Sequence, residues 1–423
     1  MLCPVRNGAE LASYSAYELV ARPLSLFGNV PIRKGTKSSL VHILDELSPS
    51  QKSLPVYTID GGHLLHKVVW LRPVTCRQIC QQYVKYVKDH YGCCYIVFYG
   101  YQAGPIPAQR KKCNFSEDKC GRQQDFLTNK NNKAGFIELL KDRLQKAGYH
   151  VHKAGDADTF IVSKASELAL PSPSVLVGED TELLVLLITH ATAGTRTRPD
   201  RIYSSQNMQE SLGHMKKYTL FFHAFTGCDS TSAPFNKGKN NAYKLLFTND
   251  SFRSQMDVFN NSFSSSDSVA AAGETLFLAM YGAKSQSNLD TARHHLYIKT
   301  VAKQQVGGSF NLATLPPTYS AARQHSLRVY LQLQQWRHMD LPPTKWGCML
   351  PNDMLLSVPT LQKVTPDNVM KLVIFRVTRT ASANEVDLNV QTCVVIVLDT
   401  VVVIDQSWKT IVNLIPEKRT LIT

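Results

Sequence analysis

Between residues 55 and 250, short apolar runs alternate with longer amphipathic stretches. Runs rich in β-branched and aromatic residues predict strands, and apolar residues three or four apart predict helices. The predicted strands are residues 56–60, 94–98, 149–151 and 174–177. The predicted helices are residues 63–91 with an interruption or start at Pro73, 136–144 with an end at Gly148, and 156–170. This alternation predicts an α/β, Rossmann-like domain with a parallel sheet flanked by helices.

The apolar run at 183–188 is expected to form a further buried strand. Residues 251–345 have a polar, helical pattern with a loop at 264–268. The segment from residue 346 is hard to assign, although 394–404 is rich in Val and Ile. The expected organisation is therefore an N-terminal extension (1–54), the α/β domain (55–250), a mainly helical extension (251–345) and a tail of uncertain fold (346–423).

The charge balance favours a polyanionic partner. The 423-residue chain is 43% hydrophobic, enough for a sizeable core, and carries 47 Lys and Arg against 33 Asp and Glu, a formal net charge of +14. The polar stretch 102–133 predicts a mobile surface excursion, in which Arg110, Lys111 and Lys112 are expected to contact nucleic acid. A generally basic surface without a specific ligand is an alternative that composition leaves open.

The expected location is nuclear or cytoplasmic. The N-terminal residues lack the basic, apolar and small-residue regions of a signal peptide, so secretion is not expected. The apolar runs 183–188 and 393–404 are too short to span a bilayer, so no membrane partner is expected. Ten cysteines without a repeated CxxC pattern predict reduced thiols rather than disulfides or a zinc site.

Acidic residues recur where the predicted strands end or helices begin. Asp60, Asp180 and Asp229 follow apolar runs, and Asp156 and Asp158 begin a predicted helix. Acids just after parallel strands converge at one edge of a sheet, where they repel each other unless a hard cation such as Mg²⁺ or Mn²⁺ neutralises them. Two such ions about 4 Å apart support phosphodiester cleavage. A single Asp is more often a turn or helix-cap residue, and spacing alone favours capping for Asp156 and Asp158.

The order of these motifs resembles the flap-endonuclease and XPG-like branch of the PIN-domain nuclease superfamily, and more closely the asteroid-like, transposon-associated proteins of animals. The matching motifs are Tyr-Thr-Ile-Asp at 57–60, Gly-Asp-Ala-Asp at 155–158, Gly-Glu-Asp-Thr-Glu at 178–182 and Thr-Gly-Cys-Asp at 226–229. The resemblance covers about residues 55–250 and implies a PIN-type sheet, two Mg²⁺ or Mn²⁺ ions, and DNA in preference to RNA. It implies catalytic roles for Asp60, Asp156, Asp158, Asp180, Glu182 and Asp229, and metal binding by all of these except Asp156.

The sequence also departs from the family pattern. Tyr99 stands where the family has its second metal-binding Asp, Glu182 replaces an Asp, and Asp156 and Asp158 replace longer Glu side chains. Three hypotheses follow: a Mg²⁺-dependent structure-selective nuclease, a catalytically weakened nucleic-acid-binding protein, and a protein-interaction scaffold with structural acids. The sequence leaves the oligomeric state open.

Two further segments resemble regions of the same family. The family places a glycine-rich turn on the DNA backbone after Gly-Cys-Asp, which implies phosphate contacts for Lys237 and Lys239; an ordinary basic turn is an equal alternative. Residues 315–336 resemble the region that follows the nuclease core in the asteroid-like proteins, which often continue into a Cys-rich tail. The Val-rich run at 394–404 raises the hypothesis of a frameshifted tail, which transcript sequencing tests.

Overall fold

The computed structural model divides the chain into two compact units. Unit 1 combines Met1–Gly35 with Ala224–Thr423, and unit 2 is Thr36–His223. The N-terminal segment therefore groups with the C-terminal helices, and these boundaries differ from those expected at 54 and 250. The structure describes residues 12–28, 32–35, 56–70, 75–100, 122–170, 174–191, 195–198, 203–283, 288–302, 310–367, 393–397 and 400–404.

Unit 2 contains a six-stranded sheet with the strand order β3-β2-β1-β4-β5-β6. The first five strands in this order are parallel, and β6 is antiparallel to β5. In the centre, Ile59 of β1 is opposite Ile96 of β2 and Val177 of β4. The α/β prediction with a parallel sheet is thus confirmed. The strands are β1 (Val56–Asp60), β2 (Cys94–Tyr99), β3 (His150–Ala154), β4 (Ser174–Val177), β5 (Thr195–Arg198) and β6 (Tyr203–Ser204).

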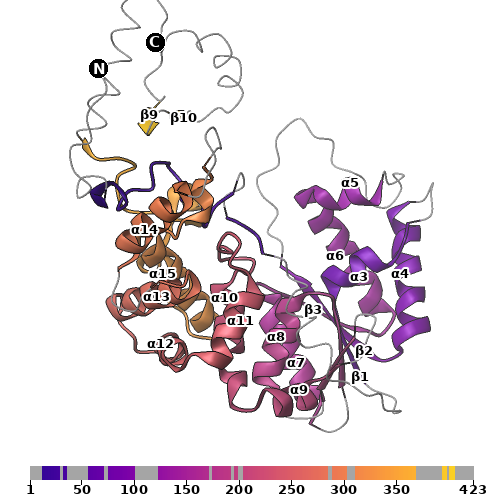
Figure 1. Cartoon of the computed structure of the whole chain (residues 1–423). Coiled ribbons are helices and arrows are strands. Elements are labelled where there is room, and N and C mark those ends of the chain that lie inside the picture. The colour runs from indigo at the N-terminus through magenta and orange to yellow at the C-terminus, as the bar shows by residue number, and fades with distance from the viewer. Residues whose placement is uncertain are drawn as a thin grey trace, which may run out of the picture. The chain divides into compact units, whose positions relative to one another are not determined.

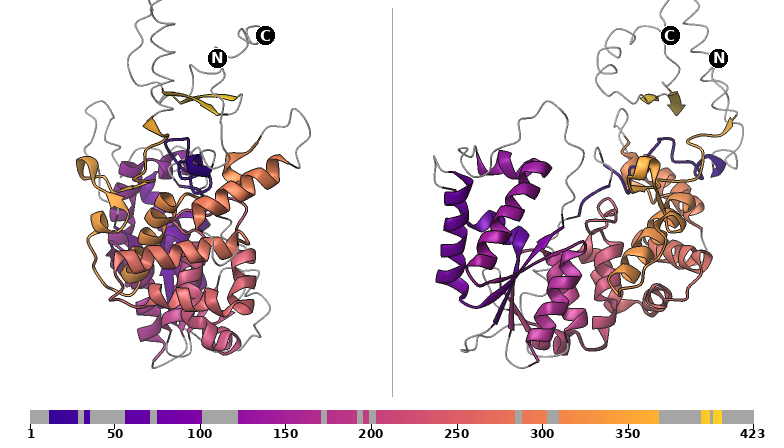
Figure 2. Two further views of the ribbon diagram at one scale, coloured as in Figure 1. Left: turned by 60° about the vertical axis from the view of Figure 1, so that its left-hand side comes forward. Right: turned by 180° about the vertical axis from the view of Figure 1, so that it is seen from behind.

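Helices cover both faces of this sheet, as the right-hand view of Figure 2 shows. One face carries α3 (Gly61–Lys67), α4 (Cys76–Tyr91), α5 (Gln123–Thr128) and α6 (Lys130–Lys146). On the other face α7 (Ala157–Leu168) packs against β1, β2 and β4, and α8 (Thr181–His190) packs on α7. The unit continues through α9 (Ser205–Leu212), the 3-10 helix η1 (Gly213–Tyr218) and α10 (Thr219–Phe225), whose last two residues belong to unit 1.

The core of unit 2 lies between the sheet and α3–α6. Phe98 of β2, Tyr83 of α4 and Phe136 of α6 are fully buried there. The Tyr83 hydroxyl accepts a hydrogen bond from Trp70 Nε1 at 3.1 Å and donates to the Leu65 carbonyl oxygen at 2.7 Å. The Tyr83 hydroxyl and the Trp70 ring N–H are therefore hydrogen-bonded inside the core, where an unpaired polar group would be costly.

The strand expected at 183–188 is wrong, because these residues form most of helix α8. Every residue from Thr181 to Ile188 is buried, so the run shows no alternation between a buried and an exposed face. A short, continuously apolar run cannot be assigned to strand or helix from periodicity. The deciding local feature is Asp180, whose side chain caps the helix.

Unit 1 is mainly helical, as expected for residues 251–345. Its helices, labelled in Figure 1, are α11 (Lys239–Thr248), α12 (Asp250–Asn260), α13 (Ser266–Met280), α14 (Leu289–Val301) and α15 (Tyr319–Gln335). The 3-10 helix η2 (Leu312–Thr314) lies between α14 and α15. The elements after α15 are η3 (Pro343–Lys345), β7 (Cys348–Met349), η4 (Pro351–Asp353), β8 (Leu356–Ser357), and an antiparallel hairpin of β9 (Cys393–Val397) and β10 (Thr400–Ile404). Within the described residues, no helix is long and apolar enough to cross a membrane.

A buried ion pair ties the N-terminal segment to the helices of unit 1. A Glu18 carboxylate oxygen lies 3.4 Å from Arg293 Nη2 of α14, and both side chains are almost fully buried. The other Glu18 oxygen accepts a hydrogen bond from the Thr318 backbone N–H at 2.7 Å, at the start of α15. Glu18 is 300 positions from Thr318 and 275 from Arg293 (293 − 18), and these contacts explain the grouping of the N-terminal segment with α14 and α15.

His325 makes the stability of unit 1 sensitive to pH. Its Nε2 donates to the Phe225 carbonyl oxygen at 3.1 Å in the interior, and burial lowers the pKa of the imidazole from 6.5 to about 3, with a further contribution from Arg328. The unfolded chain therefore binds a proton between about pH 6.5 and 3 that the folded chain excludes. The stability contributed by neutral His325 is complete above this window and is lost as pH falls through it.

We expect the free energy of unfolding to fall by about 2 kcal/mol from this residue between pH 7 and pH 5. The measurement is denaturant unfolding at both pH values for the parent and for His325→Gln, whose amide can replace the donor but does not titrate. Between these two pH values, the free energy of unfolding of His325→Gln should fall by about 2 kcal/mol less than that of the parent. Identical pH dependence of the two proteins would contradict this assignment.

Candidate functional site

Three acids stand at strand-to-helix junctions of unit 2. Asp60 is the last residue of β1, Asp156 follows β3 and Asp180 follows β4, and each caps the helix that comes next. Asp60 accepts hydrogen bonds from the backbone N–H groups of Gly62 at 2.8 Å and His63 at 3.2 Å. The helix N-termini thus fix the direction of these carboxylates and stabilise their negative charge. The capping alternative holds for all three, and capping leaves lone pairs that can still contact a ligand.

Asp60 and Asp180 lie at neighbouring strand ends. Their strands pair directly, and a Cβ atom built on Gly178 would lie 3.4 Å from Asp60 Cβ. Burial raises the pKa of Asp60, and the charge of Asp180 adds to this effect, while the hydrogen bonds from Gly62 and His63 lower the pKa. A cation near both carboxylates would reduce this repulsion.

Positive charge also reaches this edge of the sheet. Lys67 Nζ at the end of α3 lies 3.0 Å from Glu179 Oε1, and His63 Nδ1 lies 3.6 Å from the same oxygen. The Lys67 hydrogen bond is the main reason that the pKa of Glu179 is lowered. Beside Asp180, Glu182 is buried in the first turn of α8. The sequence pattern placed Glu179 among the acids beside Asp180 but did not predict its pairing with Lys67, because no local pattern links residues 112 positions apart.

Tyr99 occupies the end of β2, between the junctions that follow β3 and β1. It is the last residue of its strand and is 50% exposed, opposite Ala154 of β3. Asp158, in the first turn of α7, is half-buried, whereas Asp156 is exposed. Four consecutive strands of one sheet therefore end in, or just before, Asp156, Tyr99, Asp60 and Asp180. The Tyr99 phenol offers no carboxylate at the second of these positions.

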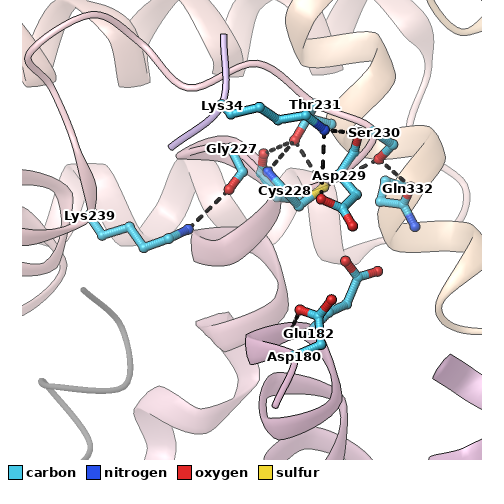
Figure 3. A network of polar contacts seen from close by, with 11 residues as sticks. Lys34, Asp180, Glu182, Gly227, Cys228, Asp229, Ser230, Thr231, Lys239 and Gln332 are labelled. Atoms are coloured by element: carbon cyan, nitrogen blue, oxygen red, sulfur yellow. Dashed lines mark hydrogen bonds and ion pairs between the residues drawn. The ribbon is translucent and has the colours of Figure 1, made fainter. Parts of the chain in front are cut away.

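Asp229 belongs to unit 1 and lies in a tight turn after α10, shown in Figure 3. Cys228 N–H donates to Thr231 Oγ1 at 3.2 Å, and that hydroxyl donates to the Ala224 carbonyl oxygen at 2.5 Å. Lys34 Nζ donates to the Asp229 carbonyl oxygen at 2.8 Å and lies 3.6 Å from its carboxylate. The N-terminal segment therefore supplies a cation to Asp229, a contact that the sequence pattern did not predict.

Gly227 is required by this turn for two reasons. Its φ of +105° is rarely adopted by side-chain-bearing residues, and a Cβ atom there would lie 2.9 Å from the Ala233 backbone nitrogen. The next part of the loop is fixed by the N-terminal segment, because Ala233 N–H donates to the Arg33 carbonyl oxygen at 2.7 Å and Phe235 N–H donates to the Ser25 carbonyl oxygen at 2.8 Å. The Gly-Cys-Asp motif thus sits in a rigid setting within unit 1.

The predicted phosphate-binding lysines have different environments. Lys239 is 3% exposed and donates to Thr226 Oγ1 at 3.2 Å and to the Gly227 carbonyl oxygen at 3.1 Å. In this placement its ammonium holds the turn rather than facing solvent, which departs from the expected surface contact. Lys237 is half-buried, with Nζ 4.9 Å from the centre of the Tyr281 ring, and its phosphate contact stays a prediction. Arg110, Lys111 and Lys112 lie outside the described residues.

The strand-end acids supply the oxygen donors that a hard metal ion needs, but the described residues do not form a complete set of metal ligands. Among the residues that the structure describes, no three His, Cys, Asp or Glu side chains form a group that could hold one ion. Asp60 and Asp180 supply carboxylate oxygens at neighbouring strand ends, the donors that Mg²⁺ and Mn²⁺ prefer, and Mg²⁺ usually keeps several waters. Binding of one ion by this pair and the expected two-ion centre both stay predictions.

The Gly61 position next to Asp60 leaves no space for a side chain. A Cβ atom there would overlap the buried Phe98 ring of β2. Gly61→Ala is therefore expected to lower the free energy of unfolding by about 1–3 kcal/mol, because the ring must move inside a packed core. Denaturant unfolding measures this effect. Gly155→Ala, where nothing lies within 4 Å of the added atom, is the matched control, and an equal loss in both variants would contradict the packing argument.

Comparisons with known proteins leave the chain without an assigned family. No family model matches the sequence, and no curated protein is similar to it. One solved structure, the T5 D15 protein co-crystallized with metal ions, aligns over 67% of this chain and 90% of its own, with 12% sequence identity and a TM-score of 0.33. A similarity of this size assigns neither a fold family nor an activity.

Proposed function

We propose that this protein is a divalent-metal-dependent nuclease of the PIN/flap-endonuclease type, which cleaves phosphodiester bonds in nucleic acid and is weakened by Tyr99. The observation that carries the proposal is that Asp60 and Asp180 come at the ends of the neighbouring parallel strands β1 and β4, close enough for the charge of Asp180 to act on the pKa of Asp60. Asp156 follows another strand of the same sheet. Ligands of open α/β sheets bind at this carboxyl edge.

The residues of unit 2 would have the following roles in cleavage. Asp60 and Asp180 would hold a Mg²⁺ or Mn²⁺ ion, which when bound activates water and neutralises charge on the phosphate. The N–H groups of Gly62 and His63 keep the Asp60 carboxylate in one orientation. The formal charge of +14 raises the local concentration of nucleic acid around the chain. We favour DNA over RNA as the substrate on the family resemblance alone.

Tyr99 supports a second candidate, a nucleic-acid-binding protein that keeps the nuclease fold without full activity. The three neighbouring strand ends in the same sheet carry acids, and the phenol at Tyr99 cannot replace a carboxylate ligand. Because its side chain is 50% exposed, Tyr99→Asp should be accommodated without disturbing the core. This substitution therefore tests the weakened site directly.

The experiment measures cleavage of labelled flap, single-stranded and duplex DNA and RNA, with Mg²⁺, Mn²⁺ or EDTA. We expect slow cleavage by the parent that requires metal, disappears in Asp60→Asn and increases in Tyr99→Asp. Activity only in Tyr99→Asp would favour the inactive, binding form of the protein. If neither protein cleaves or binds any of these substrates, both candidates fail and the interaction-scaffold hypothesis is favoured.

A further inference from the structure

Four aromatic rings form a contiguous group on one face of the sheet, which we call the ring cluster: Tyr95, His150, His152 and Phe160. Tyr95 of β2 is opposite His150 of β3, and His152 lies two residues further along the same face of β3. The Tyr95 ring centre is 4.6 Å from His150 and 6.4 Å from His152, with interplanar angles of 12° and 10°. Phe160 of α7 extends the group, 5.7 Å from His152.

The ring cluster faces solvent rather than the core. His150 and His152 are exposed, Phe160 is 38% exposed and Tyr95 is half-buried. The strand of the two histidines, β3, is at the end of the described sheet. Scattered exposed aromatic residues are common, but here several rings contact one another at the surface, and Tyr95 and His150 are stacked. A planar ligand can extend such a stack on the outer face of an exposed ring.

A cation accompanies the rings. Lys164 Nζ of α7 lies 4.9 Å from the centre of the Tyr95 ring and 2.9 Å from Glu167 Oε1. The Glu167 side chain is exposed, whereas Lys164 is 20% exposed and donates to both Glu167 oxygens, so a phosphate that binds Lys164 takes the place of this carboxylate. Rings that stack on bases, combined with Lys in a basic protein, are the features by which single-stranded nucleic acid is bound.

The position of the ring cluster also favours nucleic acid. From His152, β3 runs to the junction with Asp156, and Phe160 follows Asp158 by two residues in α7. A nucleic-acid strand whose bases stack on the rings would therefore lie only a few protein residues from the carboxyl end of β3.

A second exposed apolar group consists of Met349, Leu350, Met354, Leu355 and Leu361. These side chains carry no rings on which bases could stack, and nothing in the described part of the structure shows what covers them.

We propose that the ring cluster is a base-stacking site for unpaired nucleotides of single-stranded nucleic acid. The rings supply the stacking surface, and Lys164 supplies a phosphate contact beside it. This inference concerns binding without metal and does not require the cleavage proposed above. It assigns the four rings a ligand of one chemical class, the flat base of an unpaired nucleotide.

The test is fluorescence anisotropy in EDTA with a labelled oligothymidylate of about 20 nucleotides and with an abasic strand of the same length. The double variant His152→Ser/Phe160→Ser removes two surface rings. We expect its affinity for oligothymidylate to fall roughly tenfold or more, the effect of losing one or two stacked bases, while its affinity for the abasic strand is unchanged. Phe160→Trp, which keeps a ring, should bind at least as well as the parent.

The matched control is Phe263→Ser, because Phe263 is 93% exposed in the turn between α12 and α13 and is not part of the ring cluster. It should bind like the parent. Unchanged affinity in the double variant, or an equal loss on the abasic strand, would overturn the stacking assignment. Asp60→Asn separates the two proposals, since it should abolish cleavage without changing binding in EDTA. Circular dichroism verifies that each variant is folded.

Discussion

Asp180→Asn is expected to reduce metal-dependent cleavage by roughly 100-fold or more while leaving the fold intact. The Asn side chain can keep the helix cap, because the Oδ1 atom of Asp180 accepts the Glu182 N–H at 3.0 Å and an amide oxygen accepts equally well. The substitution therefore removes the negative charge beside Asp60 and little else. Cleavage rates at saturating Mg²⁺, compared with thermal unfolding of the same samples, measure the two effects separately.

Two further variants serve as comparisons for Asp180→Asn. Asp180→Ala loses the cap as well as the charge, so it should lose the same activity and in addition about 1 kcal/mol of stability. Asp142→Asn removes an acid of α6 that pairs with Lys146, and it should leave cleavage unchanged. If Asp180→Asn cleaves as fast as the parent, the strand-end acids are only helix caps and the nuclease proposal fails at this position.

Arg293→Met is expected to lower the free energy of unfolding by about 3–5 kcal/mol, because it leaves the buried Glu18 carboxylate without its cation. The remaining Thr318 N–H donor stabilises only one of the two carboxylate oxygens. Denaturant unfolding of the full chain measures the loss. The double variant Glu18→Leu/Arg293→Met should lose less than Arg293→Met, because replacing both charges by apolar groups removes the unpaired carboxylate.

An exposed pair in the same unit provides the control. Arg323 lies 2.9 Å from Asp267, whose side chain is 88% exposed, so Arg323→Met should cost at most about 1 kcal/mol. Similar losses for Arg293→Met and Arg323→Met would show that burial of the Glu18 pair has no special effect. The comparison thus tests whether this pair fastens the N-terminal segment to α14.

The sequence by itself determined the α/β class, four of the six strands of the sheet and the acids at three of their ends, whereas β5 and β6 were not predicted. The strands at 56–60 and 174–177 were predicted with their observed bounds, because short apolar runs bounded by turn residues are local signals. The acids that follow these strands were identified for the same reason, since an Asp between a strand and a helix marks the junction whatever its role. The local sequence also contained the capping alternative, which the structure shows at Asp60, Asp156 and Asp180.

Only the tertiary structure decided what surrounds these acids. The run at 183–188 is helical, which the sequence pattern could not show because burial on all sides removes the periodicity that separates strand from helix. Lys34 beside Asp229, Lys67 beside Glu179 and Glu18 beside Arg293 join distant segments, and no sequence pattern encodes such pairs. The ring cluster likewise depends on the register of β2 against β3, separated by more than 50 residues. Local spacing fixes elements, whereas charge pairs and stacked rings arise when packing brings those elements together.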